Sequence, residues 1–261
     1  MPRPVTVITG ASAGIGAELA RIFAANGHEL VLIARREQAL ATLADEIAAS
    51  GKPRPTVLAM DLGAGNCATR IADELASRDL AVQFIVNNAG FGLVGRAAEL
   101  SRDEQLAMID LNVRTLTELS LAFIASVTRE RGGILNVASV AGFLPGPGMA
   151  VYYATKAFVV SFTEALHREL KPRGVRVTVL CPGPVPTEFQ ARAGAPDHTG
   201  PSILERDARF VAMAGYRGLM AGRRMVVPGW PNLLVTLLPR FLPRGLVVWA
   251  MDVVQQRRFG R

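Results

Sequence analysis

The chain has 261 residues, half of them hydrophobic and a fifth charged, which fits one globular domain of α/β type with a sizeable core. The net charge of +7 arises entirely from residues 200–261, which hold ten arginines and three acidic residues; no recognisable nucleic-acid-binding module accompanies this charge, so we expect no nucleic-acid partner. Two cysteines, Cys67 and Cys181, exclude a disulfide framework and share no metal-ligand spacing, so we expect a reduced, cytoplasmic setting and no metal site.

The chain opens with a strand, a glycine-rich loop and a helix. Val5–Thr9 is a short apolar strand, GASAGIG follows, and AELARIFAANG has helical spacing; the opening MPRPVTVITG lacks the parts of a secretory signal. Gly10, Gly14 and Gly16 let the backbone approach a phosphate closely, and the helix start offers free N–H groups. The spacing G-x-x-x-G-x-G differs from the common dinucleotide fingerprint, and a turn without a ligand is the alternative. The strand–loop–helix context favours dinucleotide binding.

Two arginines follow the second expected strand, Glu29–Ala34. A site for NAD usually has an acidic residue here that binds the ribose 2′-hydroxyl, whereas arginine accommodates the 2′-phosphate of NADP. Arg35 and Arg36 stand at this strand end, and no acidic residue does. A solvated helix N-terminus is the alternative, although arginine is disfavoured at the positive end of a helix. The pattern therefore predicts NADP(H) as the cofactor.

Strands and helices alternate through the rest of the first 228 residues. We expect further strands at Thr56–Met60, Val82–Val86, Gly133–Ala138, Val175–Leu180 and Met225–Pro228, and helices at Glu37–Ser50, Cys67–Ser77, Leu100–Arg129, Tyr152–Leu170 and about Glu205–Ala221. This alternation predicts a Rossmann-type, doubly wound parallel sheet in three α/β/α layers, as a single domain over residues 1–229. The functional site should lie at the carboxyl ends of the strands.

Several polar residues fall at or near those strand ends. Asp61 follows the third strand, where it can accept a hydrogen bond from an adenine amino group or cap the next helix. Asn87 and Asn88 suit a tight turn after the fourth strand. Ser101, with Glu104 three residues later, reads as a capping box that opens the long helix. Asn112 stands in the middle of that helix, where asparagine is a poor helix former, so its position requires a reason.

Tyr152 and Lys156 are four residues apart on an expected helix and so share one face. A neighbouring ammonium favours phenolate, so we expect Lys156 to lower the pKa of Tyr152 and make it an acid or base nearer neutral pH. Ser139, which a strand delivers into a loop, supplies a hydroxyl for a substrate oxygen. A tyrosine four residues before a lysine is common on helices, so the pair gains weight from the other features of the chain.

Together these motifs resemble the short-chain dehydrogenase/reductase family over about residues 4–228. TGASAGIG is similar to the family's cofactor loop, NNAG to its turn under the cofactor, YYATK to its active-site motif and PGPVPT to its nicotinamide-contacting segment. The resemblance implies the catalytic residues Asn112, Ser139, Tyr152 and Lys156; Tyr153 is set aside because only Tyr152 is four residues before Lys156. It implies the cofactor-binding residues Gly10, Ser12, Ala13, Gly14, Ile15, Gly16, Arg35, Arg36, Asp61, Leu62, Asn88, Ala89, Gly90, Tyr152, Lys156, Pro182, Gly183, Val185 and Thr187.

The resemblance also implies an activity, namely hydride transfer between the nicotinamide of NADP(H) and a carbonyl or secondary alcohol. Tyr152 would protonate the carbonyl oxygen, Ser139 would hold that oxygen, and Lys156 would hold the nicotinamide ribose. Asn112 would help to hold a water that connects Lys156 to solvent. A homodimer or homotetramer is implied. The alternative from another class is a dinucleotide-binding sensor or scaffold without chemistry.

The tail, residues 230–261, continues past the last expected strand. It is apolar between arginines, is broken by three prolines, and has no apolar run of the roughly 20 residues that a membrane-spanning helix needs. It either packs on the domain or a dimer partner, or lies on an anionic membrane with Trp230, Phe241 and Trp249 as anchors. We expect its removal to affect association or stability rather than hydride chemistry.

Two loops, residues 143–149 and 188–222, are expected to build the substrate pocket, and residues 191–222 to be a mobile segment with one helix. Their apolar residues favour an apolar substrate, although such residues equally line an ordinary core: Phe143, Leu144, Met149, Phe189, Phe210 and Met213.

Overall fold

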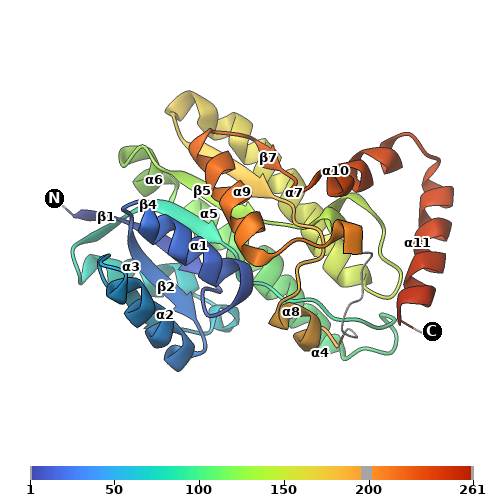
Figure 1. Ribbon diagram of the computed structural model, residues 1–261, viewed down its shortest axis with the longest axis horizontal. Coiled ribbons are helices and arrows are strands. Elements are labelled where there is room, and N and C mark those ends of the chain that lie inside the picture. Colours follow the sequence, from blue (N-terminus) through green and yellow to red (C-terminus); the bar gives the residue numbers. More distant parts are fainter. Residues whose placement is uncertain (1, 195–201, 260–261) are drawn as a thin grey trace.

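A computed structural model describes residues 2–194 and 202–259, and its centre is a parallel sheet of seven strands (Figure 1). The order across the sheet is β3-β2-β1-β4-β5-β6-β7. The strands are β1 (Arg3–Thr9), β2 (Glu29–Ala34), β3 (Thr56–Ala59), β4 (Leu80–Asn87), β5 (Gly133–Val137), β6 (Arg176–Leu180) and β7 (Met225–Val226). Strand order reverses between β1 and β4, and a crevice for a ligand forms at the carboxyl ends of the strands beside such a reversal.

Helices cover both faces of the sheet. One core forms beneath α1 (Gly14–Ala25), α2 (Glu37–Ala49) and α9 (Ala208–Met220). The other forms beneath α3 (Cys67–Ala76), α5 (Leu116–Ala122), α6 (Ile124–Arg129) and α7 (Ala150–Leu170). The doubly wound, three-layer α/β/α fold expected from the sequence is therefore confirmed.

The strands are apolar on both faces because both faces are buried. Ile8 of β1 and Leu32 of β2 point to the first core, whereas Val7 and Val31 point to the second. Successive side chains of a strand face opposite sides, so a strand covered on both sides has a continuous apolar run rather than an alternating one.

The single long helix expected at Leu100–Arg129 is wrong in one respect, because the structure divides it. Ser101 does cap α4 (Arg102–Ile109) by accepting a hydrogen bond from the Glu104 N–H at 3.4 Å. A π-helical stretch, Asp110–Thr115, then precedes α5, and Phe123 separates α5 from α6. The extra residue of a π turn often marks a functional site, and Asn112 lies in this stretch.

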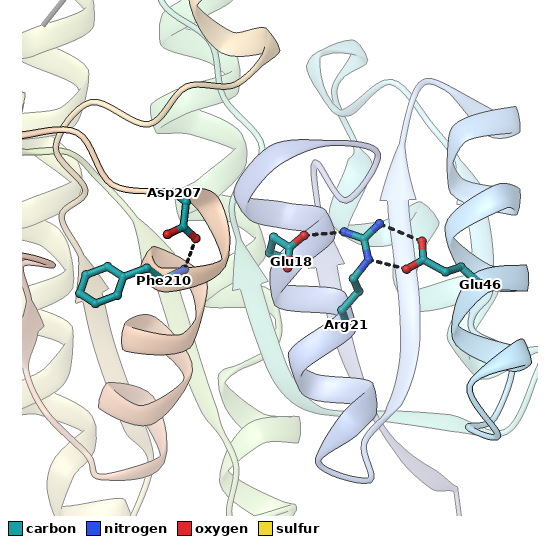
Figure 2. Close-up of polar contacts among 5 residues, drawn as sticks. All are labelled: Glu18, Arg21, Glu46, Asp207 and Phe210. Atoms are coloured by element: carbon teal, nitrogen blue, oxygen red, sulfur yellow. Dashed lines mark hydrogen bonds and ion pairs between the residues drawn. The ribbon is translucent and has the colours of Figure 1, made fainter. Parts of the chain in front are cut away.

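The segment between β6 and β7 has more structure than the one expected helix. It contains the short helix α8 (Glu188–Arg192), a 3-10 turn at Ser202–Leu204 and α9, while residues 195–201 lie outside the described part of the chain. The Asp207 side chain caps α9 by accepting from the Phe210 N–H at 2.8 Å (Figure 2). Figure 2 also shows Arg21 of α1 held between Glu18 and Glu46 of α2, at 2.7 and 2.8 Å.

The tail forms α10 (Trp230–Leu237), a 3-10 turn at Leu238–Arg240 and α11 (Arg244–Phe259), at one end of the molecule (Figure 1). Polar and apolar side chains of both helices are buried against the domain, among them Asn232, Thr236 and Val247. Trp230, Phe241 and Trp249 are exposed. Among the described residues, no helix combines the length and apolar character needed to cross a membrane.

Phe23 tests the core beneath α1 and α9. Its ring is fully buried, with centroids 4.9 Å from Tyr216 and 6.1 Å from Phe84. Phe23→Ala should lower the free energy of unfolding by about 3–5 kcal/mol, because it removes apolar contacts and leaves a cavity. The exposed Phe210, changed to Ala, is the matched control and should cost less than about 1 kcal/mol in urea denaturation. Equal losses for the two variants would contradict this packing.

Candidate active site

The glycine-rich loop lies where β1 meets α1. A Cβ on Gly16 would lie 2.3 Å from the Gly10 carbonyl oxygen, and one on Gly10 would lie 2.9 Å from the Ala89 Cα, so close backbone approach requires glycine at both positions. Helix α1 begins at Ala13 without a side-chain cap and has no acidic residue in its first turn. Its N–H groups and positive dipole end therefore suit a phosphate group, and the residues present fit the pyrophosphate of a dinucleotide.

Asn88 holds this loop from the neighbouring strand end. Its Nδ2 donates to the carbonyl oxygens of Thr9 and Gly10, at 3.0 and 3.1 Å. The Thr9 hydroxyl in turn accepts from the backbone N–H groups of Asn88 and Ala89, at 3.0 and 3.1 Å. These bonds fix the spacing between the ends of β1 and β4. Asn88 therefore positions the loop through protein contacts.

Three guanidinium groups gather near the end of β2. Arg36 donates to the Ser12 hydroxyl at 3.2 Å and forms an ion pair of 2.8 Å with Glu188 of α8. Arg35 precedes it and is exposed. Burial, and then the charge of nearby Arg35, lowers the pKa of Arg192. Helix α8 thus adds Arg192 to the two arginines expected from the sequence, and only the folded chain brings it there.

Asp61 and Leu62 follow β3. The Asp61 carboxylate accepts from the Gly63 N–H at 3.0 Å, so the capping role left open by the sequence is present. Leu62 is buried, and its carbonyl oxygen accepts from the Thr115 hydroxyl at 2.9 Å. Contact between Asp61 and an adenine stays a prediction.

Asn112 joins three segments through one buried side-chain amide. Its Oδ1 accepts from the Phe91 N–H at 3.1 Å, and its Nδ2 donates to the Phe91 carbonyl oxygen at 2.9 Å and to the Thr155 hydroxyl at 3.1 Å. A Cβ on Gly90 would lie 2.8 Å from that Oδ1. These protein contacts explain a polar residue inside a helix without the water that the sequence suggested; the water-holding role stays a prediction.

Ser139, Tyr152 and Lys156 meet beside this junction. The Ser139 hydroxyl accepts from the Ala141 N–H at 3.1 Å, donates to the Pro182 carbonyl oxygen at 3.4 Å, and lies near enough to Tyr152 to favour its phenolate. The Lys156 ammonium donates to the Val137 carbonyl oxygen at 2.9 Å, and its Nζ lies 5.8 Å from the centroid of the Tyr152 ring. All three residues expected to be catalytic therefore come together with Asn112 at the carboxyl edge of β5.

Burial governs the electrostatics of this group. It raises the pKa of Tyr152 above its ordinary value, and the hydrogen bond from Ser139 opposes that rise. Burial also lowers the pKa of Lys156 to about 8. The expectation that Lys156 lowers the pKa of Tyr152 is therefore wrong for the protein as described, because desolvation dominates and disfavours the charged form of both groups.

An apolar cluster surrounds Tyr152. Its buried members include Met108, Ala141, Met149 and Tyr153, and the side chains packed against them are Phe91, Leu93, Val94, Leu144, Val151, Phe189 and Met251. Leu144, Met149 and Phe189 were expected from the sequence. Phe143 instead packs in a cluster around Val159, Met213 packs in the core beneath α1, and Phe210 is exposed.

The loop after β6 connects both halves of the site. The Pro182 carbonyl oxygen accepts from the Val140 N–H at 2.9 Å. At the other end Thr187 caps α8, and a Cβ on Gly14 would lie 3.1 Å from the Thr187 Cγ2. Val185 is buried between them. This loop therefore links Ser139 to the glycine-rich loop.

Comparisons with known proteins agree with this arrangement. A family model described as short chain dehydrogenase matches residues 4–197. Over 209 residues the chain is 37% identical to sulfoacetaldehyde reductase 2 of Chromohalobacter salexigens, and the aligned region covers 78% of this chain and 81% of that protein. A short-chain dehydrogenase of Sphingobium yanoikuyae, solved with NADPH, has a TM-score of 0.80 and 30% identity, covering 97% and 94% of the two chains. One from Burkholderia phymatum, solved with NAD, has a TM-score of 0.80 and 28% identity, covering 92% and 93%.

Lys156 makes a testable contribution to stability against pH. Its pKa is about 8 in the folded chain against a usual 10.5, so between these values the unfolded chain binds a proton that the folded chain does not. Stability from this group should therefore rise with pH across that window. Lys156→Met lacks the effect, so any stability advantage of the variant should shrink as pH rises from 8 to 10. Urea denaturation at pH 7, 8, 9 and 10 measures it; a constant difference would contradict the burial account.

Proposed function

The chain belongs to the short-chain dehydrogenase/reductase family, and on that premise we propose that it is an NADP(H)-dependent oxidoreductase that interconverts a carbonyl group and a secondary alcohol of an apolar substrate. The observation that carries the proposal is the position of Tyr152. Its side chain lies near enough to Ser139 for that hydroxyl to favour the phenolate, the Lys156 Nζ lies 5.8 Å from its ring centroid, and apolar side chains surround it. A proton donor in a dry pocket beside a dinucleotide loop suits carbonyl reduction.

The chain's own residues supply proton transfer and orientation, and the reduced dinucleotide supplies the hydride when bound. The raised pKa of Tyr152 keeps its phenol protonated near neutral pH, which suits it to protonate the carbonyl oxygen. Ser139 offers its hydroxyl to the same oxygen. Lys156, with a pKa of about 8, is available in the charged form to stabilise the phenolate that proton transfer leaves. Oxidation of an alcohol uses the same groups in reverse.

We propose that the residues expected to hold the cofactor meet an extended dinucleotide in order from its adenosine end to its nicotinamide. Arg35, Arg36 and Asp61 would hold the adenosine end, the loop from Gly10 to Gly16 the pyrophosphate, and Asn88 to Gly90 the middle. Lys156 would hold the nicotinamide ribose, and the loop from Pro182 to Thr187 the nicotinamide. Support comes from the uncapped start of α1 and from the contact between Gly14 and Thr187.

The choice of NADP(H) over NAD(H) rests on the arginines at the end of β2. The two structural neighbours differ, since one was solved with NADPH and the other with NAD. In this chain Arg35 and Arg36 follow β2, and Arg192 lies near them. Three guanidinium groups lie here, Arg36 being paired with Glu188, and neither of the two residues that follow β2 is acidic, which favours a 2′-phosphate.

The pocket lining supports an apolar carbonyl compound as substrate. Met108, Met149 and Tyr153 are buried around Tyr152, with Leu144 and Phe189 packed against them. The relative from Chromohalobacter is named for sulfoacetaldehyde, a small sulfonated aldehyde. A pocket with this lining would bury apolar substituents at about 25 cal/mol per Å² of surface, whereas a sulfonate would lose hydration there.

We also propose a cytoplasmic homodimer or homotetramer. Support comes from apolar side chains left exposed on the helices of one face: Leu106 and Ile109 of α4, Leu121 of α5 and Phe158 of α7. Contact with an anionic membrane would fall elsewhere, on the exposed side of α10 and α11, where Arg240 and Arg244 accompany Phe241 and Trp249.

Tyr152→Phe tests the acid–base assignment. It keeps the ring but removes the proton donor, so kcat for carbonyl reduction should fall by at least about 100-fold. The NADPH dissociation constant, measured by fluorescence titration, should change little. Tyr216→Phe is the matched control, because it removes a hydroxyl from a tyrosine in the opposite core. A Tyr152→Phe enzyme that keeps full turnover would refute the assignment.

Arg35→Ala tests cofactor choice. A hydrogen bond to a charged group contributes about 1.5–3 kcal/mol, so NADPH should bind roughly 10- to 150-fold more weakly, while NADH should be nearly unaffected. Arg54→Ala, which removes an exposed arginine paired with Asp45, is the control and should alter neither affinity. Equal weakening for both cofactors would remove Arg35 from the 2′-phosphate site.

A further inference from the structure

The tail helix α11 contacts the apolar cluster around Tyr152. Met251 packs against the buried cluster formed by Met149, Tyr152 and Tyr153. Gln255, one turn further on, donates from its Nε2 to the Tyr153 hydroxyl at 3.0 Å and is only 4% exposed. The residues 247, 251 and 255 recur every fourth position, which is the spacing of one helix face. The inner face of α11 is therefore directed at the apolar cluster around Tyr152.

The other faces of the same helix are open. Leu246, Trp249 and Val254 are exposed, with Trp249 at 64%. An exposed apolar face gains nothing from folding, so it does not explain why α11 takes this position. The contacts of Met251 and Gln255, both on the inner face of α11, do explain this position.

The hydrogen bond from Gln255 attaches α11 to Tyr153, whose ring is itself held by packing. A Cβ on Gly146 would lie 2.2 Å from the Tyr153 Cγ, so the backbone of the loop after β5 lies directly against this ring. The Tyr153 ring also meets the Tyr152 ring edge-on, with centroids 6.1 Å apart. The Gly95 N–H donates to the Gly148 carbonyl oxygen at 2.8 Å, which joins the two loops on which α11 rests. Movement of α11 would therefore disturb the surroundings of Tyr152.

Burial of the Gln255 amide costs free energy, because one of its polar atoms is left unsatisfied. The Gln255 Oε1 is buried without a hydrogen-bond partner among the described residues, and an unsatisfied buried acceptor costs roughly 1–3 kcal/mol. A small cavity of about 50 Å³ remains between α11 and the loops, lined by Val94, Gly95, Arg96, Pro147, Gly148, Asp252, Gln255 and Gln256. Simple packing would favour an apolar residue at 255. The directional bond to Tyr153 instead fixes the distance of α11 from the pocket.

The first tail helix also reaches the site. Asn232 is fully buried, and its Nδ2 donates to the carbonyl oxygens of Pro228 and Leu204, at 2.8 and 3.0 Å. A Cβ on Gly183 would lie 2.3 Å from the Asn232 Oδ1. The loop expected to face the nicotinamide is thus supported by α10. The tail is continuous with the site at two places.

We infer that α11 is the outer wall of the substrate pocket, that the Gln255–Tyr153 hydrogen bond sets its position, and that Met251 limits the size of the carbonyl compound admitted. Gln255 is a positioning residue, since it acts through Tyr153. The inference rests on the proposed function and revises the expectation that removal of the tail would spare the hydride chemistry. A substrate with one large apolar substituent would meet Met251.

Met251→Ala tests the wall. The ratio of kcat/KM for a bulky apolar ketone to that for a small methyl ketone should rise at least about tenfold, since a single methylene in a pocket is worth 10- to 200-fold. Val254→Ala, on the exposed face of the same helix, is the matched control and should leave the ratio unchanged. NADPH affinity and the melting temperature should be similar in the two variants. A ratio unchanged in Met251→Ala would overturn the inference.

A double-mutant cycle tests the hydrogen bond. Gln255→Leu and Tyr153→Phe should each raise KM for the bulky ketone more than they change kcat, and the double variant should be no worse than either single one. Additive effects would show that the two side chains act separately and would overturn the role of the bond.

Ligand binding can distinguish failure of the proposed wall from failure of the proposed function. If the wild-type protein binds NADPH but reduces no carbonyl, the proposed function fails. The wall is then tested by calorimetric binding of the corresponding bulky and small alcohols to wild type and Met251→Ala. Tighter binding of the bulky alcohol by the variant, by about the same factor, would support the wall; equal binding would overturn it.

Discussion

The side-chain amide of Asn112 is the constraint on which the site depends. It satisfies both backbone polar groups of Phe91 and the hydroxyl of Thr155, and so joins the turn after β4, the π-helical stretch and α7. An ordinary α-helical turn positions its side chains by a fixed 3.6-residue repeat, and the π turn shifts that repeat at this residue. The hydrogen bond to Thr155 thus fixes the π-helical stretch against α7, the helix that carries Tyr152 and Lys156.

Desolvation gives the site its chemical character. A buried phenol and a buried amine both favour the neutral form, so Tyr152 keeps its proton while Lys156 titrates near pH 8. When a proton leaves Tyr152, the phenolate that remains becomes a partner for the ammonium of Lys156, and each charge stabilises the other. The hydrogen bond from Lys156 to the Val137 carbonyl oxygen holds the ammonium in place beside Tyr152.

The sequence predicted most of the sheet and most of the site for one physical reason. Buried parallel strands appear as apolar runs, and polar or glycine residues just after those runs must meet at one edge; this located Gly10, Asn88 and Ser139. The sequence could not reveal contacts made by folding back from a distance, such as Arg192 near Arg36, Asn232 on Gly183 or Gln255 on Tyr153. The predicted lowering of the Tyr152 pKa was wrong, because burial of the phenol raises that pKa and the residue spacing does not reveal burial. Asn232, a polar residue within an apolar stretch, was a signal in the tail of a specific partner.

We propose that this edge of the sheet reduces an apolar carbonyl with NADPH, and a panel of carbonyl substrates tests that activity. Purified full-length protein would be mixed with NADPH or NADH and a set of ketones and aldehydes, including a small sulfonated aldehyde, while absorbance of the reduced cofactor and formation of alcohol are followed together. The account predicts loss of NADPH with apolar ketones, faster than loss of NADH, with one alcohol formed per cofactor consumed. Tight NADPH binding without turnover of any carbonyl, or of any alcohol with the oxidised cofactor, would contradict it.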